Sequence, residues 1–391
     1  MTVQATPAQP FYPPGGLGAP KDRQGHAAGI DVGLPAGTEV FSADNHISLA
    51  DDIFYERLPA EFRDKAPRIW YEDGAYELGI DGMSFLPPEF TQVLMQYDPL
   101  LGAGSGNPRA RREQLAEDGV RKELAFPNAL LALLFMPDRD LKERCFRIYN
   151  EYIAGIQEAS PGRFHGVGLI NWWDGAGARR TLDELKSLGL RTFLMPLNAG
   201  HTDEGPVDYA SEKMDPVWEA IEESGVPVSH HIGESPLSAP CERNGIAVGM
   251  VHNVAPFREM FGRYVLGGIL DRHPGLKVGW FEGGINWVLS ALQDAEHMVA
   301  SYRHMFNHEI RHEPRYYWDT SMYASFMVDP LGLRLIDGIG VDRVMWSSDY
   351  PHNESTYGYS EKSIAAVVDA VGPEAAAKVV SGNVQRFLGL A

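Results

Sequence analysis

The stretch RVMWSSDYPH at residues 343–352 is an apolar run that ends on polar and ionisable side chains. Short apolar runs of this kind are typical of buried parallel strands. Seven further runs have a similar character, and they lie at 40–46, 123–128, 164–171, 191–196, 227–233, 277–284 and 316–322. The chain therefore predicts eight buried strands.

The segments between these runs have the spacing of helices. Apolar residues recur three and four positions apart in RRTLDELKSLG at 179–189, DPVWEAIEESG at 215–225 and INWVLSALQDAEHM at 285–298. Two of these segments end on Gly just before the next strand, as helices commonly do. Strands and helices that alternate in this way predict an α/β protein built as a (β/α)8 TIM barrel. Such barrels accept insertions up to the length of this 391-residue chain.

Two segments fall outside the repeating units. Residues 1–38 are rich in Pro and Gly and predict an extended N-terminal arm, so that the barrel itself occupies 39–391. Residues 47–118 form a long insertion after the first strand. Loops at this end of a barrel often shape access to the active site, so the insertion is either a lid or a packing extension.

The composition, with 44% hydrophobic and 22% charged residues, is that of an ordinary globular protein. The net charge of −19 argues against nucleic acid as a partner, because phosphate backbones need concentrated positive charge. The sequence contains no apolar run long enough to cross a membrane and no recognisable signal peptide. The two cysteines, Cys145 and Cys241, lack the spacing of a disulfide framework or a thiolate metal site. We expect a cytoplasmic protein.

Ionisable side chains stand where several predicted strands end, and in a barrel these ends converge on one mouth. Asp44 and His46 are two positions apart, so both point to the same face of the first strand. His230 and His231 are adjacent, so only one of them faces the barrel interior and the other is a packed or hydrogen-bonded histidine.

Three further candidates follow the sixth and eighth strands. Glu282 ends an apolar run, and because a buried carboxylate is costly unless paired, it either binds an Arg or serves a metal or catalytic role. Asp349 reaches the mouth or caps a helix, and His352 lies three residues later. Imidazole and carboxylate donors suit a divalent metal, for which we expect zinc, with iron or manganese as alternatives and one or two ions bound.

Other histidines and aromatic residues have simpler explanations. His165 lies near the start of the third strand, at the end of the barrel opposite the mouth, and we expect a structural role for it. Trp172 and Trp173 follow the third strand, where they form either an aromatic wall of the substrate pocket or part of the core. Asn171 and Asn198 are candidates to orient a polar substrate.

Taken in order, these motifs resemble the amidohydrolase-related metal-dependent hydrolases, in the branch of aminocarboxymuconate semialdehyde decarboxylase and related aromatic acid decarboxylases. The resemblance covers about residues 40–390. It rests on DNHIS at 44–48 with ERLPAEFRDKAPRI at 56–69, MDPVWEAIEESGVPVSHHIG at 214–233, LDRHPGLKVGWFEGGINWV at 270–288 and DRVMWSSDYPHNES at 342–355. It implies a barrel whose metal is held by His46, His231 and Asp349. His231 aligns rather than His230, because the family's histidine is followed by one residue and then a glycine.

The sequence departs from these decarboxylases at two positions. They carry a second histidine on the first strand where this chain has Ser48, so either Asp44 substitutes or the metal is held more weakly. They also carry a catalytic histidine before two glycines where this chain has Glu282. Some relatives of the branch look like dinuclear oxygenases with added ligands, and Glu282 and His352 are the positions that would supply them here.

Three functions follow from this resemblance. The first is a metal-dependent hydrolase or decarboxylase, a carbon–carbon lyase, for a small carboxylated or cyclic substrate, with Glu282, His352 and Asp349 as catalytic candidates. The second is a dinuclear non-haem iron or mixed-metal oxygenase. The third is a weakly active or inactive subunit that stabilises a homologous catalytic partner. In each case we expect an oligomer, either a homo-oligomer or one formed with a homologous chain.

Overall fold

The computed structural model describes residues 31–49, 52–72, 75–80, 83–84, 107–127, 131–134, 136–202, 205–234, 243–352 and 354–390. The first 30 residues of the predicted arm, residues 85–106 of the predicted insertion and Cys241 lie outside the described residues. Cys145 is a buried free thiol.

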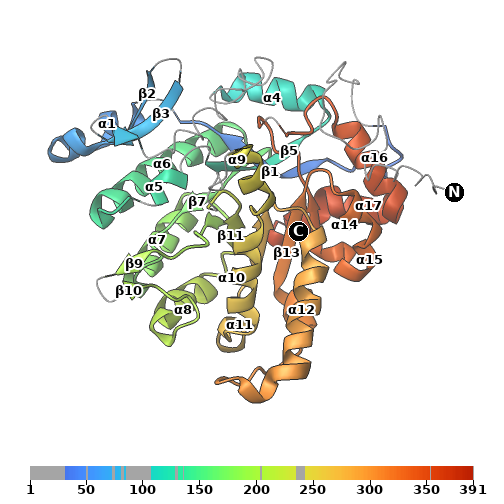
Figure 1. Cartoon of the computed structure of the whole chain (residues 1–391). Coiled ribbons are helices and arrows are strands. Elements are labelled where there is room, and N and C mark those ends of the chain that lie inside the picture. Colours follow the sequence, from blue (N-terminus) through green and yellow to red (C-terminus); the bar gives the residue numbers. More distant parts are fainter. Residues whose placement is uncertain are drawn as a thin grey trace.

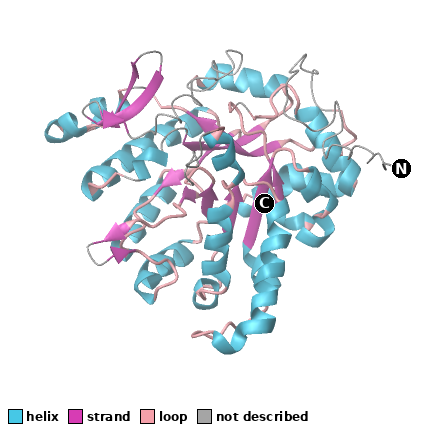
Figure 2. Ribbon diagram, in the orientation of Figure 1, coloured by secondary structure: helices cyan, strands magenta, loops and turns pink. Residues whose placement is uncertain are grey.

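The strands at the centre of the molecule are short, parallel and buried. They are β1 (Phe41–Ile47), β5 (Lys122–Pro127), β6 (Phe164–Gly166), β7 (Gly168–Leu169), β8 (Phe193–Leu194), β11 (Val228–His231), β12 (Val278–Phe281), β13 (Met322–Phe326) and β14 (Val344–Trp346). They pair in the order β1-β5-β6 in one sheet and β14-β13-β12-β11-β8-β7 in the other. Figure 2 shows the strands inside and the helices around them.

The two sheets continue into each other at both edges. β6 and β7 are separated only by Val167. At the other edge, the N–H of Asp349 donates to the carbonyl of Asp44 at 2.8 Å, and the N–H of His46 donates to the carbonyl of Tyr350 at 2.7 Å. The strands therefore follow one another around a (β/α)8 barrel, and the predicted fold class is confirmed.

Helices return the chain on the outside of this barrel (Figure 1). They are α4 (Pro108–Glu117), α5 (Leu131–Leu134), α6 (Arg139–Ala159), α7 (Gly175–Ser187), α8 (Asp215–Ser224), α9 (Gly245–Val251), α10 (Ala255–Val265), α11 (Ile269–Arg272), α12 (Asn286–Tyr302), α13 (Pro314–Ser321), α14 (Pro330–Arg334), α15 (Ile336–Ile339), α16 (Ser360–Val371), α17 (Pro373–Ala377) and α18 (Asn383–Phe387). Single turns of 3-10 helix, η2 (Glu212–Met214), η3 (Arg303–Met305) and η4 (Val341–Arg343), and a π-helical turn, η5 (Lys378–Gly382), connect some of them.

Local sequence fixes where the main helices begin and end. Asp138 caps α6 by accepting a hydrogen bond from the N–H of Leu141 at 3.1 Å, and Asp174 caps α7 in the same way. Gly225 ends α8 with a φ of 69°, a left-handed conformation that glycine adopts without strain. These caps fix where the helices that connect the strands begin or end.

The predicted insertion contains its own small elements. They are α1 (Ile53–Arg57), the 3-10 helix η1 (Ala60–Lys65) and an antiparallel sheet of β2 (Arg68–Glu72), β3 (Ala75–Ile80) and β4 (Met83–Ser84). Figure 1 shows α1, β2 and β3 together at the edge of the molecule. A second hairpin, β9 (His201–Thr202) with β10 (Gly205–Pro206), follows β8.

One predicted strand is wrong. Residues 316–322 were predicted as the seventh strand, but α13 occupies Pro314–Ser321 and the strand β13 begins only at Met322. The buried residues of α13 are Pro314, Tyr317, Trp318 and Ser321, which is the three-and-four spacing of a helix. A proline in the first turn also suits a helix start. The aromatic run YYW has high strand propensity, but its tertiary setting is helical.

The barrel is filled and covered by aromatic residues. Trp218, Trp280, Trp318 and Trp346 are among the largest fully buried side chains. Trp346 donates from its Nε1 to the Ser363 hydroxyl at 2.9 Å, so its polar atom is satisfied inside the core. Within the described part of the chain, no helix is both long and apolar enough to cross a membrane.

Candidate metal centre

The structure brings together all six residues that the sequence proposed as metal donors. Asp44 and His46 come from β1 and His231 from the end of β11, while Glu282 directly follows β12. Asp349 and His352 lie in the loop that follows β14 (Val344–Trp346). Their donor atoms form two overlapping groups, Asp44, His46, His231 and Glu282, and His46, Glu282, Asp349 and His352, each with all donor atoms within 4.8 Å of one another. The carboxyl ends of the strands therefore converge on one mouth.

His46 lies in the middle of the cluster. Its Nε2 is 3.2 Å from Asp349 Oδ1, 3.3 Å from Glu282 Oε2 and 3.6 Å from Asp44 Oδ1. Its ring stacks on that of His352, with 3.8 Å between the centroids. Three carboxylates therefore approach one imidazole nitrogen from different strands.

His231 and His352 both approach Oε2 of Glu282. His231 Nε2 is 3.0 Å from Glu282 Oε2 and 3.5 Å from Asp44 Oδ1. His352 Nδ1 is 3.8 Å from Glu282 Oε2 and 3.0 Å from Asp349 Oδ1. His352 is the more accessible of these two histidines, with 18% of its side chain exposed against 5% for His231.

The buried donor atoms at this mouth have no hydrogen-bond partner among the described residues outside the cluster, and they face only one another. They are both carboxylate oxygens of Asp44, His46 Nε2, His231 Nε2, Glu282 Oε2 and Asp349 Oδ1. Buried polar atoms are nearly always paired in folded proteins, and a shared set of unpaired ones calls for an explanation. A divalent cation would satisfy all of them at once, and carboxylate and imidazole are donors that such cations accept.

Three irregularities of the backbone orient these donor side chains toward the cluster. The pairing of β1 with β5 shifts between Ser42 and Asn45, which is a bulge at the position of Asp44. Glu282 has a φ of 66° and Asp349 a φ of 60°, a left-handed conformation that costs energy for residues with a side chain. Such strain persists where the surrounding structure enforces it, and it occurs often at functional sites.

Hydrogen bonds select the ring nitrogen that each histidine offers. His231 Nδ1 lies 2.8 Å from the carbonyl of Ile232, an acceptor, so Nδ1 carries a proton and Nε2 is the nitrogen that faces the cluster. His230 is turned the other way. Its ring nitrogens bond the Met195 carbonyl at 2.8 Å and the Tyr264 hydroxyl at 2.9 Å. The prediction that only one of the two adjacent histidines faces the interior is confirmed.

Burial sets the protonation of three of these groups. It raises the pKa of Asp349 to about 6, with the neighbouring Glu282 carboxylate acting in the same direction. It also raises the pKa of Asp44 above its ordinary value. Burial, followed by the nearby His352, lowers the pKa of His46 to about 4. Each of these groups is therefore biased toward its neutral form in the metal-free protein.

His231 and Glu282 form a charged pair. Burial disfavours charge on both groups, but Asp44 and Glu282 outweigh it and raise the pKa of His231 well above its ordinary value. In the same way His231 and His46 overcome burial and hold the pKa of Glu282 well below its usual range. Because metal ligands must be deprotonated, binding a cation here requires His231 to release its proton.

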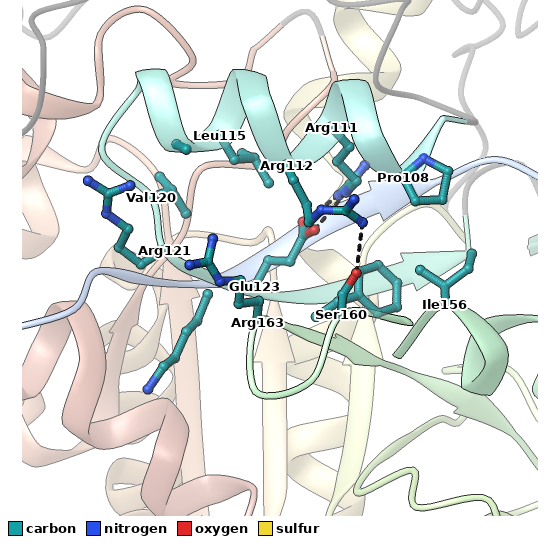
Figure 3. Close-up of a pocket in the computed structure, with 13 residues that line it drawn as sticks. Pro108, Arg111, Arg112, Leu115, Val120, Arg121, Glu123, Ile156, Ser160 and Arg163 are labelled. Carbon is teal, nitrogen blue, oxygen red and sulfur yellow. Dashed lines mark hydrogen bonds and ion pairs between the residues drawn. The ribbon is translucent and has the colours of Figure 1, made fainter. Parts of the chain in front are cut away.

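A buried network lies behind β1, and the sequence does not predict it. Figure 3 shows its ion pair between Arg111 and Glu123. Arg111 on α4 is 1% exposed, donates to both carboxylate oxygens of Glu123 at 2.8 and 2.6 Å, and donates to the carbonyl of His46 at 2.5 Å. Asn45 donates to the same Glu123 at 2.7 Å and accepts from the N–H of Tyr350 at 3.0 Å. This network fixes the backbone that carries Asp44, His46 and Asp349. A buried Arg and Glu give no local sequence signal, because they resemble surface residues of a helix and a strand end.

The tryptophans and asparagines predicted as possible substrate contacts bind other residues of the protein. Trp172 is buried against Phe146, with 5.8 Å between the ring centroids, and Lys142 Nζ lies 5.0 Å from the rings of both Trp172 and Trp173. Asn171 donates to Glu143 at 2.8 Å and to Asp174 at 3.0 Å, so its amide organises the start of α7. Asn198 accepts from the N–H of Gly200 at 2.9 Å.

The chain matches a family model. The model for amidohydrolases matches residues 104–390, which include the barrel from α4 onward. A search of curated proteins found no match.

Solved structures from several bacteria share the fold. An amidohydrolase from Mycobacterium avium subsp. paratuberculosis has a TM-score of 0.70 and 17% identity over 91% of this chain and 99% of its own. 5-carboxyvanillate decarboxylase from Sphingomonas paucimobilis has a TM-score of 0.65 and 20% identity over 91% and 100%. The same enzyme from Novosphingobium aromaticivorans, with manganese and 4-hydroxy-3-methoxy-5-nitrobenzoic acid, has a TM-score of 0.67 and 16% identity over 94% and 100%. At such identities the likeness shows a common fold.

Proposed function

This chain belongs to the amidohydrolase family, and on that basis we propose that it is a metal-dependent hydrolase or decarboxylase for a small carboxylated substrate. The observation that carries the proposal is the set of buried donor atoms without partners on Asp44, His46, His231, Glu282 and Asp349. Polar groups without partners are costly to bury unless they serve a ligand.

The donor chemistry fits a divalent metal. In this proposal His46, His231 and Asp349 hold the ion, Asp44 assists in place of the missing first-strand histidine, and Glu282 is a further donor. Bound there, a divalent cation would polarise a substrate carboxylate or carbonyl, or lower the pKa of a water molecule. Manganese is the first metal to test because a decarboxylase with this fold contains it, and zinc and iron suit the same donors.

His352 is placed to move a proton. Its Nδ1 lies 3.0 and 3.2 Å from the two carboxylate oxygens of Asp349, which hold the ring in one orientation at the edge of the cluster. Its side chain is more exposed than those of the other donors and is accessible to a substrate that enters from the mouth. Histidine is also the residue most often used as a general acid or base near neutral pH.

The substrate class that we propose is a hydroxylated aromatic carboxylate. Two relatives with this fold are named for 5-carboxyvanillate and 2,6-dihydroxybenzoate. In a decarboxylation the bond from the ring to the carboxyl carbon breaks, carbon dioxide leaves, and the ring carbon gains a proton. His352 would deliver that proton, because Glu282 has a pKa well below its usual range and is ionised. Glu282 takes the position where the resemblance implies a histidine, so the proton route of this chain would differ from that of the decarboxylases.

Turnover of a substrate panel tests the proposal. The purified protein, depleted of metal and reloaded with manganese, zinc or ferrous iron, is incubated without oxygen with 5-carboxyvanillate, 2,6-dihydroxybenzoate and related acids. We expect release of carbon dioxide or a hydrolysis product in a loaded sample and none in the depleted one. An Asp349→Asn variant should be inactive, while Asp369→Asn, an exposed aspartate of α16, should retain activity. Full activity without metal would contradict the proposal.

A second candidate is supported by the overlap of the donor groups. His46 and Glu282 belong to both, so the two groups together would offer donors for two ions instead of one. Two ions that include iron would favour oxygen chemistry. Oxygen uptake coupled to substrate loss, with two metals per chain, would support the oxygenase. Turnover under anaerobic conditions with one metal per chain would eliminate it.

The proposal of a catalytically weak partner subunit has less support. The cluster retains six donors despite Ser48 directly after the first strand, which favours a metal-binding chain in its own right. Assembly as a homo-oligomer, or with a homologous chain, stays a proposal. Full activity of the purified homomer would exclude the dependent-subunit alternative, and the mass of that homomer in solution would give its assembly state.

A further inference from the structure

The chain after β11 turns beside the metal centre and leads to a carboxylate that the proposed function does not use. β11 ends at His231, and Ile232, Gly233 and Glu234 follow it at the mouth. Gly233 has a φ of 110°, a backbone conformation that residues with a side chain rarely adopt. This short turn, residues 231–234, therefore connects a donor of the cluster to the partly buried side chain of Glu234.

Glu234 binds the segment that follows the neighbouring strand β8. Its Oε1 accepts from the N–H of Leu197 at 2.6 Å, and its Oε2 accepts from the N–H of Asn198 at 2.9 Å. Within the described part of the chain, no lysine or arginine pairs with this carboxylate. Hydrogen bonds to a charged acceptor are stronger than those to a neutral one. One side chain thus ties the loop after β11 to the loop after β8.

The register of the sheet places these two loops side by side. β8 and β11 pair in parallel, and the N–H of Met195 extends the pairing beyond β8 by donating to the carbonyl of Ser229 at 2.9 Å. In this register residues 196–197 run beside 231–232. The two hydrogen bonds of Glu234 continue the connection where the ladder of the strands ends. They therefore act next to the metal donor on β11.

The same turn carries the group that orients the His231 ring. His231 Nδ1 lies 2.8 Å from the carbonyl of Ile232, which leaves Nε2 as the nitrogen that faces the cluster. On one side of this carbonyl, the N–H of Ile232 donates to the carbonyl of Phe281 over 3.4 Å, a long hydrogen bond. On the other side, Glu234 holds the chain through two shorter ones. Glu234 is therefore the stronger of the two anchors.

A carboxylate at this position has a cost that a neutral side chain would avoid. Burial raises the pKa of Glu234 to about 7, while the N–H groups of Leu197 and Asn198, followed by the nearby His231, act in the opposite direction. A glutamine could not replace it fully, because only one of its two terminal atoms accepts a hydrogen bond. The use of both oxygens indicates that the position serves to hold the two loops together.

We propose that Glu234 is a positioning residue of the metal centre, which fixes the 231–234 turn so that the carbonyl of Ile232 holds His231 Nε2 toward the other donors. This role rests on the metal-binding function proposed above. Glu234 is not a donor itself, and it acts on metal affinity through His231. Hydrogen-bond partners behind a metal-binding histidine typically contribute about 10–100-fold to the affinity for the metal.

The manganese affinity of a Glu234→Gln variant tests this role on the full-length protein. Metal-depleted chains are titrated with Mn²⁺ in a calorimeter at pH 8, where the wild-type carboxylate is mostly ionised. We expect the variant to bind at least tenfold more weakly than the wild type. The matched control is Glu222→Gln. Glu222 on α8 accepts from the N–H of Gly275 at 2.6 Å, before β12 begins and thus at the other end of the barrel, and this variant should bind as the wild type does.

Amide hydrogen exchange separates positioning from a general loss of stability. In Glu234→Gln we expect the peptide that contains Leu197 and Asn198 to exchange at least tenfold faster, with the other barrel strands unchanged. In Glu222→Gln this peptide should exchange at the wild-type rate. Faster exchange throughout the barrel would show a purely structural role and overturn the proposal, as would unchanged exchange at Leu197 and Asn198.

The titration also distinguishes this role from the function on which it rests. A wild-type chain that binds no manganese would contradict both. A wild-type chain that binds manganese no more tightly than Glu234→Gln does would overturn the role of Glu234 alone.

Discussion

Asp349 shows how a single residue combines strain, burial and function. Its side chain is fully buried, its φ is 60°, and burial raises its pKa to about 6. Each of these features costs free energy in a protein without a ligand at this mouth. Together they are consistent with a position that is maintained for metal binding rather than for stability.

The donor residues could be predicted from the sequence, but the buried hydrogen bonds that hold them in place could not. Asp44, His46, His231, Glu282 and Asp349 could be found because each lies in a strand of the barrel or in the loop that follows one, where side chains converge by geometry. The contact of Arg111 with His46 spans 65 positions, and that of Asn45 with Glu123 spans 78. No local pattern predicts pairs that the tertiary fold alone brings together.

At the residue scale we predict that His352→Gln lowers kcat about 10²–10⁴-fold, the usual contribution of a general acid or base. Metal content should stay at the wild-type value, because the other donors are intact. Steady-state kinetics on an accepted aromatic carboxylate, together with metal analysis, measures both effects. His304→Gln, an exposed histidine of η3, is the control. Wild-type kcat in the His352 variant would remove this residue from the proposed mechanism.

Elements were predicted well where the periodicity was unambiguous. The helices at 179–189, 215–225 and 285–298 correspond to α7, α8 and α12. The seventh strand was misplaced because the aromatic run at 316–318 favours strands by propensity, whereas its buried face has helical spacing. The third strand was predicted as one run, and the structure interrupts it at Val167 between β6 and β7.

At the element scale, the ion pair between α4 and β5 stabilises the barrel seam. Glu123→Gln would leave the Arg111 charge buried without a partner, and we predict a loss of about 3–5 kcal/mol in the free energy of unfolding. Urea unfolding followed by circular dichroism measures it. Glu184→Gln removes the same charge from an exposed pair with Arg147 and should cost less than about 1 kcal/mol. Similar losses of unfolding free energy in both variants would show that the buried pair stabilises the protein no more than the exposed pair does.

For the whole molecule, the eightfold repetition made the fold predictable from sequence. An error in one strand does not change the architecture, because the remaining strand and helix units still define a closed barrel. The arm at 1–38 and the insertion at 47–118 could be recognised as additions. Their packing depends on contacts for which the sequence has no periodic signal.

The stability of the whole molecule should fall in mild acid in part because of His165. Burial, followed by Arg191 and Lys122, lowers the pKa of His165 to about 4. The unfolded chain, with an ordinary pKa of about 6.5, therefore binds a proton that the folded chain excludes. This contribution is fully present above pH 6.5 and is lost as the pH falls toward 4, up to about 3 kcal/mol.

A His165→Phe variant isolates that contribution. Phenylalanine keeps an aromatic ring against Phe41, which stacks on His165 with 5.3 Å between centroids, and it does not titrate. We predict that the difference in unfolding free energy between variant and wild type grows as the pH is lowered from 6.5 to 4. Urea unfolding at several pH values measures this difference. A constant difference over that range would show that His165 is not the responsible group.

The number of metal ions bound per purified chain tests most directly whether the donor cluster is a metal centre. After incubation with manganese, zinc or ferrous iron and removal of excess metal, we predict at least one divalent ion per wild-type chain. A His46→Asn, His231→Asn double variant that remains folded should retain almost none, while His297→Asn on the exposed face of α12 should bind as the wild type does. A wild-type chain that retains none of the three metals, or a double variant that binds them equally well, would contradict the assignment of this mouth as a metal centre.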